Sequence, residues 1–199
     1  MPADRAGEPM TLIDWIAGGV LWANLPVPVY WLVLHSGVAF WRRHVRAGYA
    51  TAVVAGWGSA SVLAWFYGRR LLNAASVPVP VKWAGAALIA FDILVLSQVG
   101  RQMGGHRLVG QAELTDSGEM KRDGIYGRVR HPRYAAMLVS TLGACLMAAR
   151  PVMWCVAAAW AAVVAMMIRV EERELVARFG AAYEEYRRRV PAVWPRIFW

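Results

Sequence analysis

Long apolar stretches recur along this chain, and charged residues gather at the ends of these stretches. A helix that crosses a membrane needs about 20 consecutive apolar residues, and five such crossings are expected. They fall at 12–41, 47–67 and 79–99, and the last two form the arms of a helical hairpin over 134–168. The pattern therefore predicts an all-α, integral membrane fold in a single domain, residues 1–199.

The first two stretches carry signals beyond their hydrophobicity. Asn24, Pro26 and Pro28 interrupt the first stretch, which is too long for one straight crossing. Because proline removes a helical hydrogen bond, we expect either one kinked, tilted span or an interfacial helix followed by a crossing. The second stretch is rich in Gly, Ala and Ser, which let helix backbones approach closely in lipid, so we expect it to pack inside the bundle.

The C-terminal half combines a polar loop, a hairpin and a helix of mixed character. Residues 100–133 contain no apolar run long enough to cross, which predicts a loop. Only Arg150 and Pro151 separate the two spans that follow, and so short a connection forces an antiparallel hairpin. Within residues 169–199, apolar positions recur every three or four residues among charges, which predicts an amphipathic helix and a tail.

Composition and charge narrow the class of protein. The chain is 58% hydrophobic and only 18% charged, which argues against an ordinary soluble domain. The net charge is +9, but the basic residues lie at the ends of apolar stretches instead of on one solvated face, so we expect no nucleic-acid binding. Cys145 and Cys155 lie inside apolar segments and are expected to pack there. No spacing typical of a metal site occurs, so no metal is expected.

The distribution of basic residues predicts an orientation. With five crossings and the N-terminus outside, seventeen of the 22 Lys and Arg residues lie on the cytoplasmic side. The C-terminus, the loop at 100–133 and the helix within 169–199 are then all cytoplasmic, and the membrane is expected to be an inner or plasma membrane. Residues 1–10 lack the basic start and short apolar core of a cleaved signal peptide, so we expect the first span to be retained.

Two polar clusters remain as candidates for chemistry, at 124–134 and 169–174. The hairpin should bring them together, because they flank its two open ends. Glu171 or Glu172 could neutralise an ammonium group, and Arg130 or His131 could bind carboxylate or hydroxyl groups, as a zwitterionic ligand requires. The alternative is that the arginines reach lipid headgroups while the glutamates balance their charge.

The same residues resemble the isoprenylcysteine carboxyl methyltransferase family, whose relatives include phospholipid N-methyltransferases and bacterial thiol methyltransferases. The pattern reads Arg130-His131-Pro132-x-Tyr134, an apolar hairpin, Glu171-Glu172, Leu175, Phe179-Gly180, Tyr183, Tyr186 and Arg189-Val190-Pro191. It covers roughly residues 125–191. Two positions depart from the family pattern: Ala136 stands where glycine is frequent, and Ile125 stands where the family usually has proline.

The resemblance implies a membrane enzyme that uses S-adenosyl-L-methionine at the cytoplasmic face. Carried over residue by residue, it implies a cofactor-binding set of Tyr126, Arg130, His131, Pro132, Tyr134, Glu171 and Glu172. It also implies that Arg169 and Glu172 act near the methyl acceptor. The expected acceptor is a lipid or lipid-like small molecule, most like an isoprenylcysteine carboxylate methylated on oxygen. A phospholipid amine or a thiol are the alternatives, and an amine would need a base, for which Glu172 or His131 are candidates.

Other readings stay open. The C-terminal pattern is also similar to parts of membrane sterol reductases, which would use NADPH, and a non-catalytic membrane scaffold is a third class. Asp92 and His35 are polar side chains inside predicted spans, where such groups are costly and serve either interhelical hydrogen bonds or function.

Overall fold

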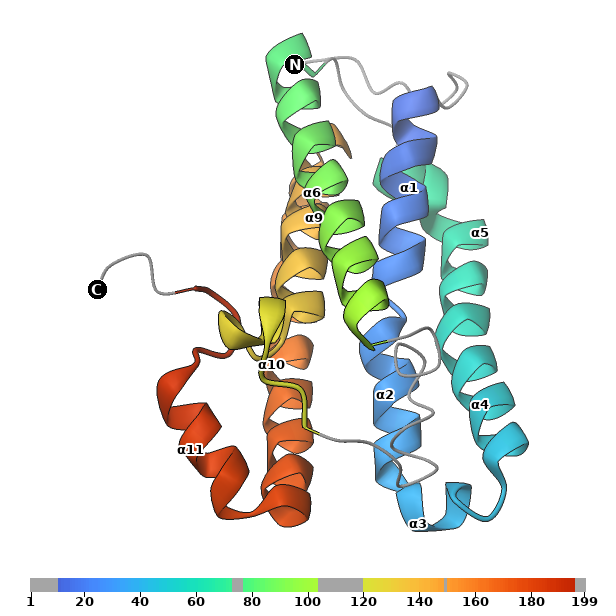
Figure 1. The fold of residues 1–199 in the computed structure, drawn as a ribbon. Helices are drawn as coiled ribbons and strands as arrows, with labels where there is room; N and C mark the ends of the chain where they lie inside the picture. Colours follow the sequence, from blue (N-terminus) through green and yellow to red (C-terminus); the bar gives the residue numbers. More distant parts are fainter. Residues whose placement is uncertain (1–10, 73–76, 104–119, 149, 196–199) are drawn as a thin grey trace.

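The chain folds as a bundle of long helices (Figure 1). The computed structural model describes residues 11–72, 77–103, 120–148 and 150–195, and no strand occurs in those segments. Within these segments, four helical stretches are long and apolar enough to cross a membrane, namely Leu12–His35, Val45–Gly68, Val79–Met103 and Pro151–Phe179. The expected all-α, membrane-integral fold class is confirmed.

The first apolar stretch is one kinked span followed by a short helix. Helix α1 covers Leu12–Asn24, α2 covers Val27–Ser36 and α3 covers Val38–Trp41. The break between α1 and α2 falls at Pro26, where the proline ring disrupts the regular helical hydrogen bonding. The apolar span itself ends at His35, so the structure supports the kinked crossing over the alternative of an interfacial helix.

The second span is a single helical rod with a π-helical turn in its middle. It consists of α4 (Val45–Val53), the π-turn η1 (Val54–Gly58) and α5 (Ser59–Leu72). A Cβ on Gly56 would lie 3.2 Å from the carbonyl oxygen of Pro26, so the rod approaches the first span closely at that point. Most of its large apolar side chains are exposed, including Val62, Leu63, Trp65 and Phe66. The expectation that it packs inside the bundle is wrong, because its close contact with the first span is a narrow one around Gly56.

The most extensive helix contact joins α6 (Val79–Met103) to α9 (Pro132–Ala148). The two backbones touch through Gly85 and Gly143. A Cβ on Gly85 would lie 2.7 Å from the Gly143 carbonyl oxygen, and a Cβ on Gly143 would lie 2.6 Å from the Gly85 carbonyl oxygen. Glycine is therefore required on both sides of this crossing, as is common where helices pack closely in lipid.

The hairpin forms as expected, with α9 leading into α10 (Pro151–Phe179). Helix α10 continues well past the predicted end of the span and stops at Gly180, whose φ of +55° is strained for any other residue. Helix α11 (Ala181–Arg189) then turns back toward the bundle, so the expected amphipathic helix is divided in two. Between α9 and α10 lies an inner apolar cluster of Tyr134, Met137, Trp160, Val164 and Ile168.

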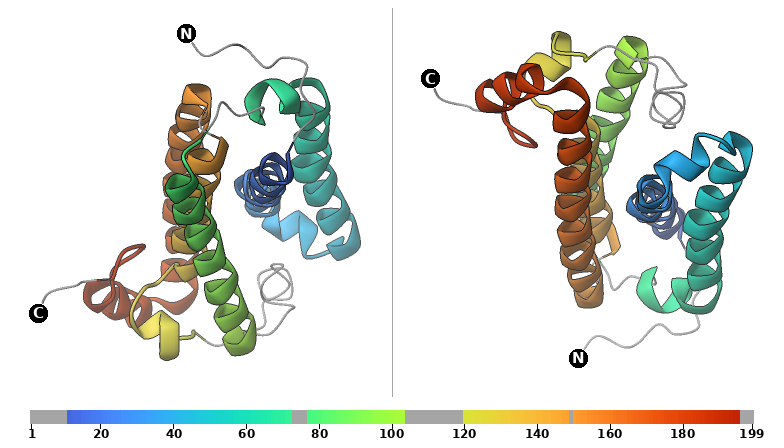
Figure 2. Two further views of the ribbon diagram at one scale, coloured as in Figure 1. Left: turned by 90° about the horizontal axis from the view of Figure 1, so that it is seen from above. Right: turned by 90° about the horizontal axis from the view of Figure 1, so that it is seen from below.

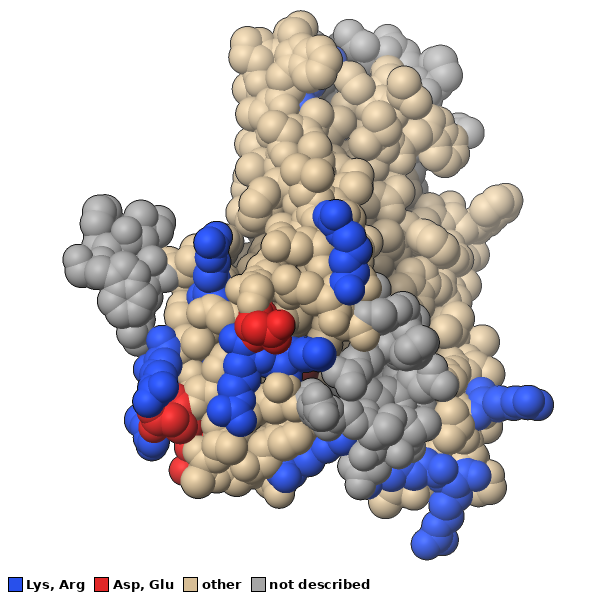
Figure 3. Space-filling view, viewed as in Figure 1, with Lys and Arg blue, Asp and Glu red and all other residues tan. Residues whose placement is uncertain are grey.

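Seen along the bundle axis, α6, α9 and α10 form one group, α1 and α2 lie beside it, and α4 and α5 lie on the far side (Figure 2). On the face shown in Figure 3, charged side chains gather over the half of the molecule that holds α11, while the other half is almost entirely uncharged. The expected loop at 100–133 and the tail are described only in part, because residues 104–119 and 196–199 lie outside the described segments.

Candidate functional site

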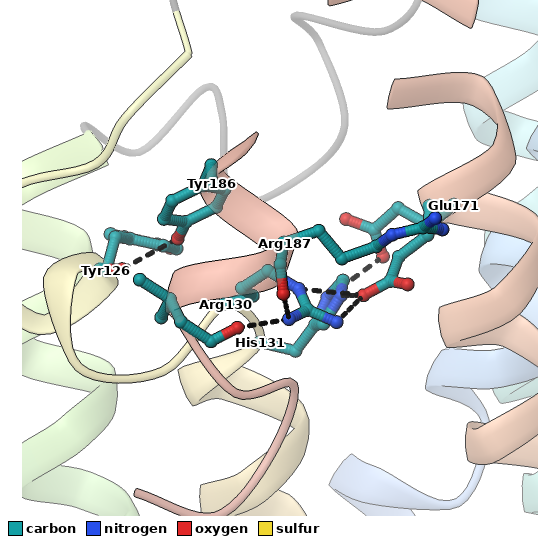
Figure 4. Close-up of polar contacts among 8 residues, drawn as sticks. Tyr126, Arg130, His131, Glu171, Tyr186 and Arg187 are labelled. Atoms are coloured by element: carbon teal, nitrogen blue, oxygen red, sulfur yellow. Dashed lines mark hydrogen bonds and ion pairs between the residues drawn. The ribbon is translucent and has the colours of Figure 1, made fainter. Parts of the chain in front are cut away.

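Arg130 lies at the centre of a polar cluster built from three parts of the chain (Figure 4). Its Nε donates to Glu172 Oε1 at 2.9 Å, and its Nη2 donates to the same oxygen. Its Nη1 donates to the carbonyl oxygen of Arg187 at 3.0 Å and to that of Val190. The guanidinium thus ties the segment before α9 to α10 and to the end of α11.

Backbone hydrogen bonds fix the segment that carries this guanidinium. The Arg130 N–H donates to the Pro191 carbonyl at 2.9 Å, and the His131 N–H donates to the Ala192 carbonyl at 2.8 Å. Pro132 follows as the first residue of α9, where proline costs no helical hydrogen bond. The C-terminal segment after α11 therefore serves as a brace for the Arg130-His131 pair.

His131 is buried and faces two carboxylates on α10. Its Nε2 lies 3.2 Å from Glu172 Oε1, and its Nδ1 lies 3.8 Å from Glu171 Oε2. Its ring centroid is 5.9 Å from that of Tyr134, which points into the inner apolar cluster. The imidazole is therefore held between the carboxylate pair and the apolar interior.

Tyrosine hydroxyls complete the cluster. Tyr186 donates from its hydroxyl to the Tyr126 carbonyl at 2.6 Å. The Tyr183 hydroxyl is buried and has no hydrogen-bond partner among the described residues. Burial raises the pKa of Tyr126 and of Tyr183, and nearby carboxylates raise both values further. Burial also raises the pKa of Tyr186 to about 12. All three phenols therefore stay neutral at physiological pH.

The structure brings most of the predicted site residues together. Arg130, His131, Glu171 and Glu172 meet at one end of the hairpin, as the short turn at Arg150 and Pro151 predicts. Tyr126 joins them through its carbonyl, and Pro132 and Tyr134 are buried at the start of α9.

Arg169 stands apart from this cluster. It is exposed on α10, and among the described residues no hydrogen bond or ion pair joins it to the carboxylates. Tyr183 and Tyr186 are buried on α11 and also lie against the charged cluster, so they serve both packing and the site. Their helical spacing carries the same signal for either role, so the sequence offered no means to separate the two.

A second polar network crosses the helices next to the site. Arg133 donates from Nη1 to Asp92 Oδ1 at 2.8 Å, and the Ser140 hydroxyl donates to Asp92 Oδ2 at 2.8 Å. Asn24 in turn donates from Nδ2 to the Ser140 hydroxyl at 2.8 Å. This network links α1, α6 and α9, and it identifies the partners of Asp92 that the sequence left open.

A third polar contact lies where α2 meets α10. His35 Nδ1 lies 2.7 Å from Glu174 Oε2, and the His35 side chain is only 3% exposed. The indole of Trp31 stacks on the imidazole with ring centroids 5.5 Å apart. Trp31 also packs against the inner apolar cluster.

The polar cluster around Arg130 can bind positive and negative groups of one ligand a short distance apart. The two α10 carboxylates and the imidazole lie side by side, and neutral phenols adjoin them. Such a set suits a ligand that carries an ammonium group together with hydroxyl or carboxylate groups. Among the described residues, no group of three or more His, Cys, Asp or Glu side chains is placed to hold a metal ion.

Comparisons with known proteins agree with this geometry. The phospholipid methyltransferase family profile matches residues 81–182, half of the chain, from α6 to the start of α11. The chain is also similar to methanethiol S-methyltransferase 2 of Bradyrhizobium diazoefficiens, with 34% identity over 108 residues. That match covers 54% of this chain and only 38% of the relative. No solved structure is significantly similar to the chain. The resemblance drawn from the sequence is confirmed, and the chain belongs to the phospholipid methyltransferase family.

Proposed function

We propose that this protein is a membrane methyltransferase that uses S-adenosyl-L-methionine and methylates a small hydrophobic thiol. The observation that carries the proposal is the convergence of His131, Glu171 and Glu172 beside a buried phenol, at the charged end of an apolar bundle. Family membership supports methyl transfer as the reaction class.

The residues present fit such a cofactor. The Tyr183 hydroxyl is buried without a partner among the described residues, which is costly unless a ligand satisfies it. Among the residues that the structure describes, the ion pair of Glu171 is with the imidazole of His131, at 3.8 Å, and we assign its carboxylate to an ammonium group. S-adenosyl-L-methionine, when bound, would supply an electrophilic methyl group on a sulfonium centre.

We propose for Arg130 a role different from the cofactor contact that the resemblance implies. Its donors already serve Glu172 and two backbone carbonyls, so little of the guanidinium is left to bind a ligand. We assign to Arg130 the positioning of Glu172, and to Glu171, His131 and Tyr183 the contacts with the cofactor. Pro132 and Tyr134 place His131 at the start of α9.

The thiol is favoured among the acceptors considered from the sequence. The similar protein from Bradyrhizobium diazoefficiens is named for methanethiol S-methylation, whereas isoprenylcysteine has no comparable support. An apolar thiol partitions into a bilayer and can reach the site laterally, and Arg169 on the exposed side of α10 is a candidate to meet it there. Glu172 stays a candidate near the acceptor.

The charge distribution supports a site at the cytoplasmic surface of an inner or plasma membrane. The charged half of the molecule holds α11 and the polar cluster (Figure 3), and basic residues favour the cytoplasmic side. If α9, the first arm of the hairpin, crosses as well, the crossings number five, and the N-terminus then lies outside and the C-terminus in the cytoplasm.

Two measurements test the proposal. Titration of S-adenosylhomocysteine into the detergent-solubilised protein by calorimetry should show binding, and Glu171→Gln should weaken it at least tenfold. Labelled-methyl transfer should then be measured with alkanethiols, prenylcysteine and vesicles of phosphatidylethanolamine. Binding of NADPH alone would support the reductase, and binding of neither ligand would support a scaffold. Transfer to prenylcysteine or lipid but not to thiols would overturn the acceptor.

A further inference from the structure

We propose that Gln102, one residue before the end of α6, is a positioning residue that holds Tyr126 in the cofactor-binding site. The proposal rests on the proposed function and deepens it, because Tyr126 belongs to the cofactor-binding set that the family resemblance implies. Gln102 lies outside that set. Its side chain reaches the short helical turn η2 (Gly124–Gly127), which contains Tyr126.

The side chain of Gln102 and the start of η2 fit closely together. The carboxamide oxygen of Gln102 accepts from the Ile125 N–H at 3.4 Å. Gly124 has a φ of +60°, which favours glycine. A Cβ on Gly124 would overlap the Gln102 carboxamide nitrogen and lie 2.8 Å from its Cδ. Glycine at this position therefore leaves room for the carboxamide, which in turn holds the first peptide group of the turn.

Tyr126 is held on two further sides. Its carbonyl oxygen accepts from the Tyr186 hydroxyl of α11 at 2.6 Å (Figure 4). Ile125 and Tyr126 also pack against an apolar patch that α6 and α9 form together. That patch consists of Val95, Val99 and Ala136. Helix α11 thus holds the turn through a carbonyl, the patch holds it through side chains, and Gln102 holds it at its start.

The position of Tyr126 matters because its phenol lies near the carboxylate that we assign to the ammonium group. The charge of Glu171 adds to burial in raising the pKa of Tyr126 above its ordinary value, so the two side chains lie close together. The Val129 N–H donates back into the turn at 3.1 Å and ties it to the following Arg130. A shift of the turn would therefore displace Tyr126 and the residues next to Arg130 together.

Substitutions of Gln102 separate its hydrogen bond from its packing. Gln102→Met keeps the length of the side chain but has no strong acceptor for the Ile125 N–H, whereas Gln102→Glu keeps an acceptor oxygen. In the full-length, detergent-solubilised protein, Gln102→Met should weaken binding of S-adenosylhomocysteine about three- to tenfold, the range of one lost hydrogen bond. Gln102→Glu should stay within about twofold of the native affinity. Calorimetry measures both.

Kinetics distinguish positioning from a general loss of structure. In labelled-methyl transfer to an alkanethiol, Gln102→Met should raise KM for S-adenosyl-L-methionine and leave kcat at saturating cofactor within about twofold. Its thermal unfolding temperature should stay near that of the native protein. A role in folding alone would instead lower the unfolding temperature and leave the affinity of the folded protein unchanged.

Gln98→Met is the matched control. Gln98 precedes Gln102 by one turn of α6 and is exposed. This variant makes the same chemical change on the same helix, away from η2. It should therefore change neither the affinity for S-adenosylhomocysteine nor the KM for the cofactor.

A second pair of variants tests the fit between Gln102 and Gly124. Gly124→Ala displaces the Gln102 carboxamide, and it also strains the backbone at a φ of +60°. In a Gln102→Ala background no carboxamide is left to displace, and only the strain remains. Gly124→Ala should therefore weaken binding of S-adenosylhomocysteine by a factor at least threefold larger in the native background than in the Gln102→Ala background.

Failure of this proposal is distinguishable from failure of the proposed function. A native protein that binds no S-adenosylhomocysteine overturns the proposed function. If the native protein binds it and Gln102→Met binds it equally well, the positioning role of Gln102 is wrong while the proposed function stands. The same holds if Gln102→Glu binds as weakly as Gln102→Met, or if Gly124→Ala has the same effect in both backgrounds.

Discussion

Arg133 in the first turn of α9 donates from Nη1 to Asp92 Oδ1 in the middle of α6, at 2.8 Å. The other carboxylate oxygen of Asp92 accepts from Ser140, which accepts from Asn24. An ionisable side chain within an apolar helix is costly unless it is paired, and two side chains of α9 satisfy both carboxylate oxygens of Asp92, while α1 joins the network through Asn24. Because Arg133 follows His131 by only two residues, the network also anchors the polar cluster to the bundle.

Removing Asp92 should therefore destabilise the protein. Asp92→Ala leaves the Arg133 guanidinium without its carboxylate and Ser140 without its acceptor, and we expect a loss of about 1–3 kcal/mol in the free energy of unfolding. Denaturant unfolding in detergent measures it. Gln98→Ala on the same helix is the control, because Gln98 is exposed, and it should change stability by less than about 0.5 kcal/mol. Equal effects of the two variants would show that the network contributes no stability.

The sequence predicted those features of the fold that depend on local pattern. Hydropathy located the spans, and the two-residue link at Arg150 and Pro151 predicted that His131 and Glu172 meet. The end of α10 could not be predicted, because charges and apolar residues continue past it and only the φ of Gly180 stops the helix.

Partners across helices were beyond the sequence. Asp92 and His35 were recognisable as costly polar groups in apolar spans, but Arg133 and Glu174 were not identifiable as their partners. Which side chains meet depends on how each helix is rotated about its axis, and hydropathy alone leaves that angle open. The prediction that the second span lies inside the bundle was wrong for the same reason. Small residues indicate that a helix packs closely against a neighbour, but they do not indicate how much of its surface is packed.

The crossing of α6 and α9 predicts that a single methyl group disrupts it. Gly143→Ala would place its Cβ 2.6 Å from the Gly85 carbonyl oxygen and 3.0 Å from Leu88 Cβ, so the helices must separate. We expect a loss of about 1–3 kcal/mol, typical of overpacking, and Gly85→Ala should behave alike. Thermal unfolding in detergent, followed by circular dichroism, measures the change.

Gly19→Ala is the matched control for this pair. A Cβ on Gly19 meets no atom within 4 Å, and alanine is favoured over glycine in helices by up to about 1 kcal/mol. This variant should be neutral or slightly stabilising. If Gly143→Ala were as stable as Gly19→Ala, the close contact of the two backbones would be unnecessary for the fold.

The Arg130–Glu172 pair should couple stability to cofactor binding. Glu172→Gln leaves a guanidinium that is only 8% exposed without its counter-charge, and breaking such a buried pair costs about 3–5 kcal/mol. We expect a lower unfolding temperature and at least tenfold weaker binding of S-adenosylhomocysteine, measured by thermal shift and calorimetry. Glu185→Gln breaks an exposed pairing with Arg188 and Arg189, and it should change neither quantity measurably. Unaltered binding by Glu172→Gln would show that the Arg130–Glu172 pair does not hold the cofactor-binding residues in place.

The buried phenols predict a loss of stability at high pH. Burial raises the pKa of Tyr186 from its ordinary value of 10.0 to about 12, and the pKa values of Tyr126 and Tyr183 are raised as well. Between these pH values the unfolded chain has released protons that the folded chain still holds, so the free energy of unfolding falls as pH rises. Tyrosinate absorbance should therefore appear at higher pH in the folded protein than in the same protein unfolded in guanidinium. Tyr186→Phe should remove part of the high-pH step, and a titration identical to that of the native protein would mean that its hydroxyl is not buried against the Tyr126 carbonyl.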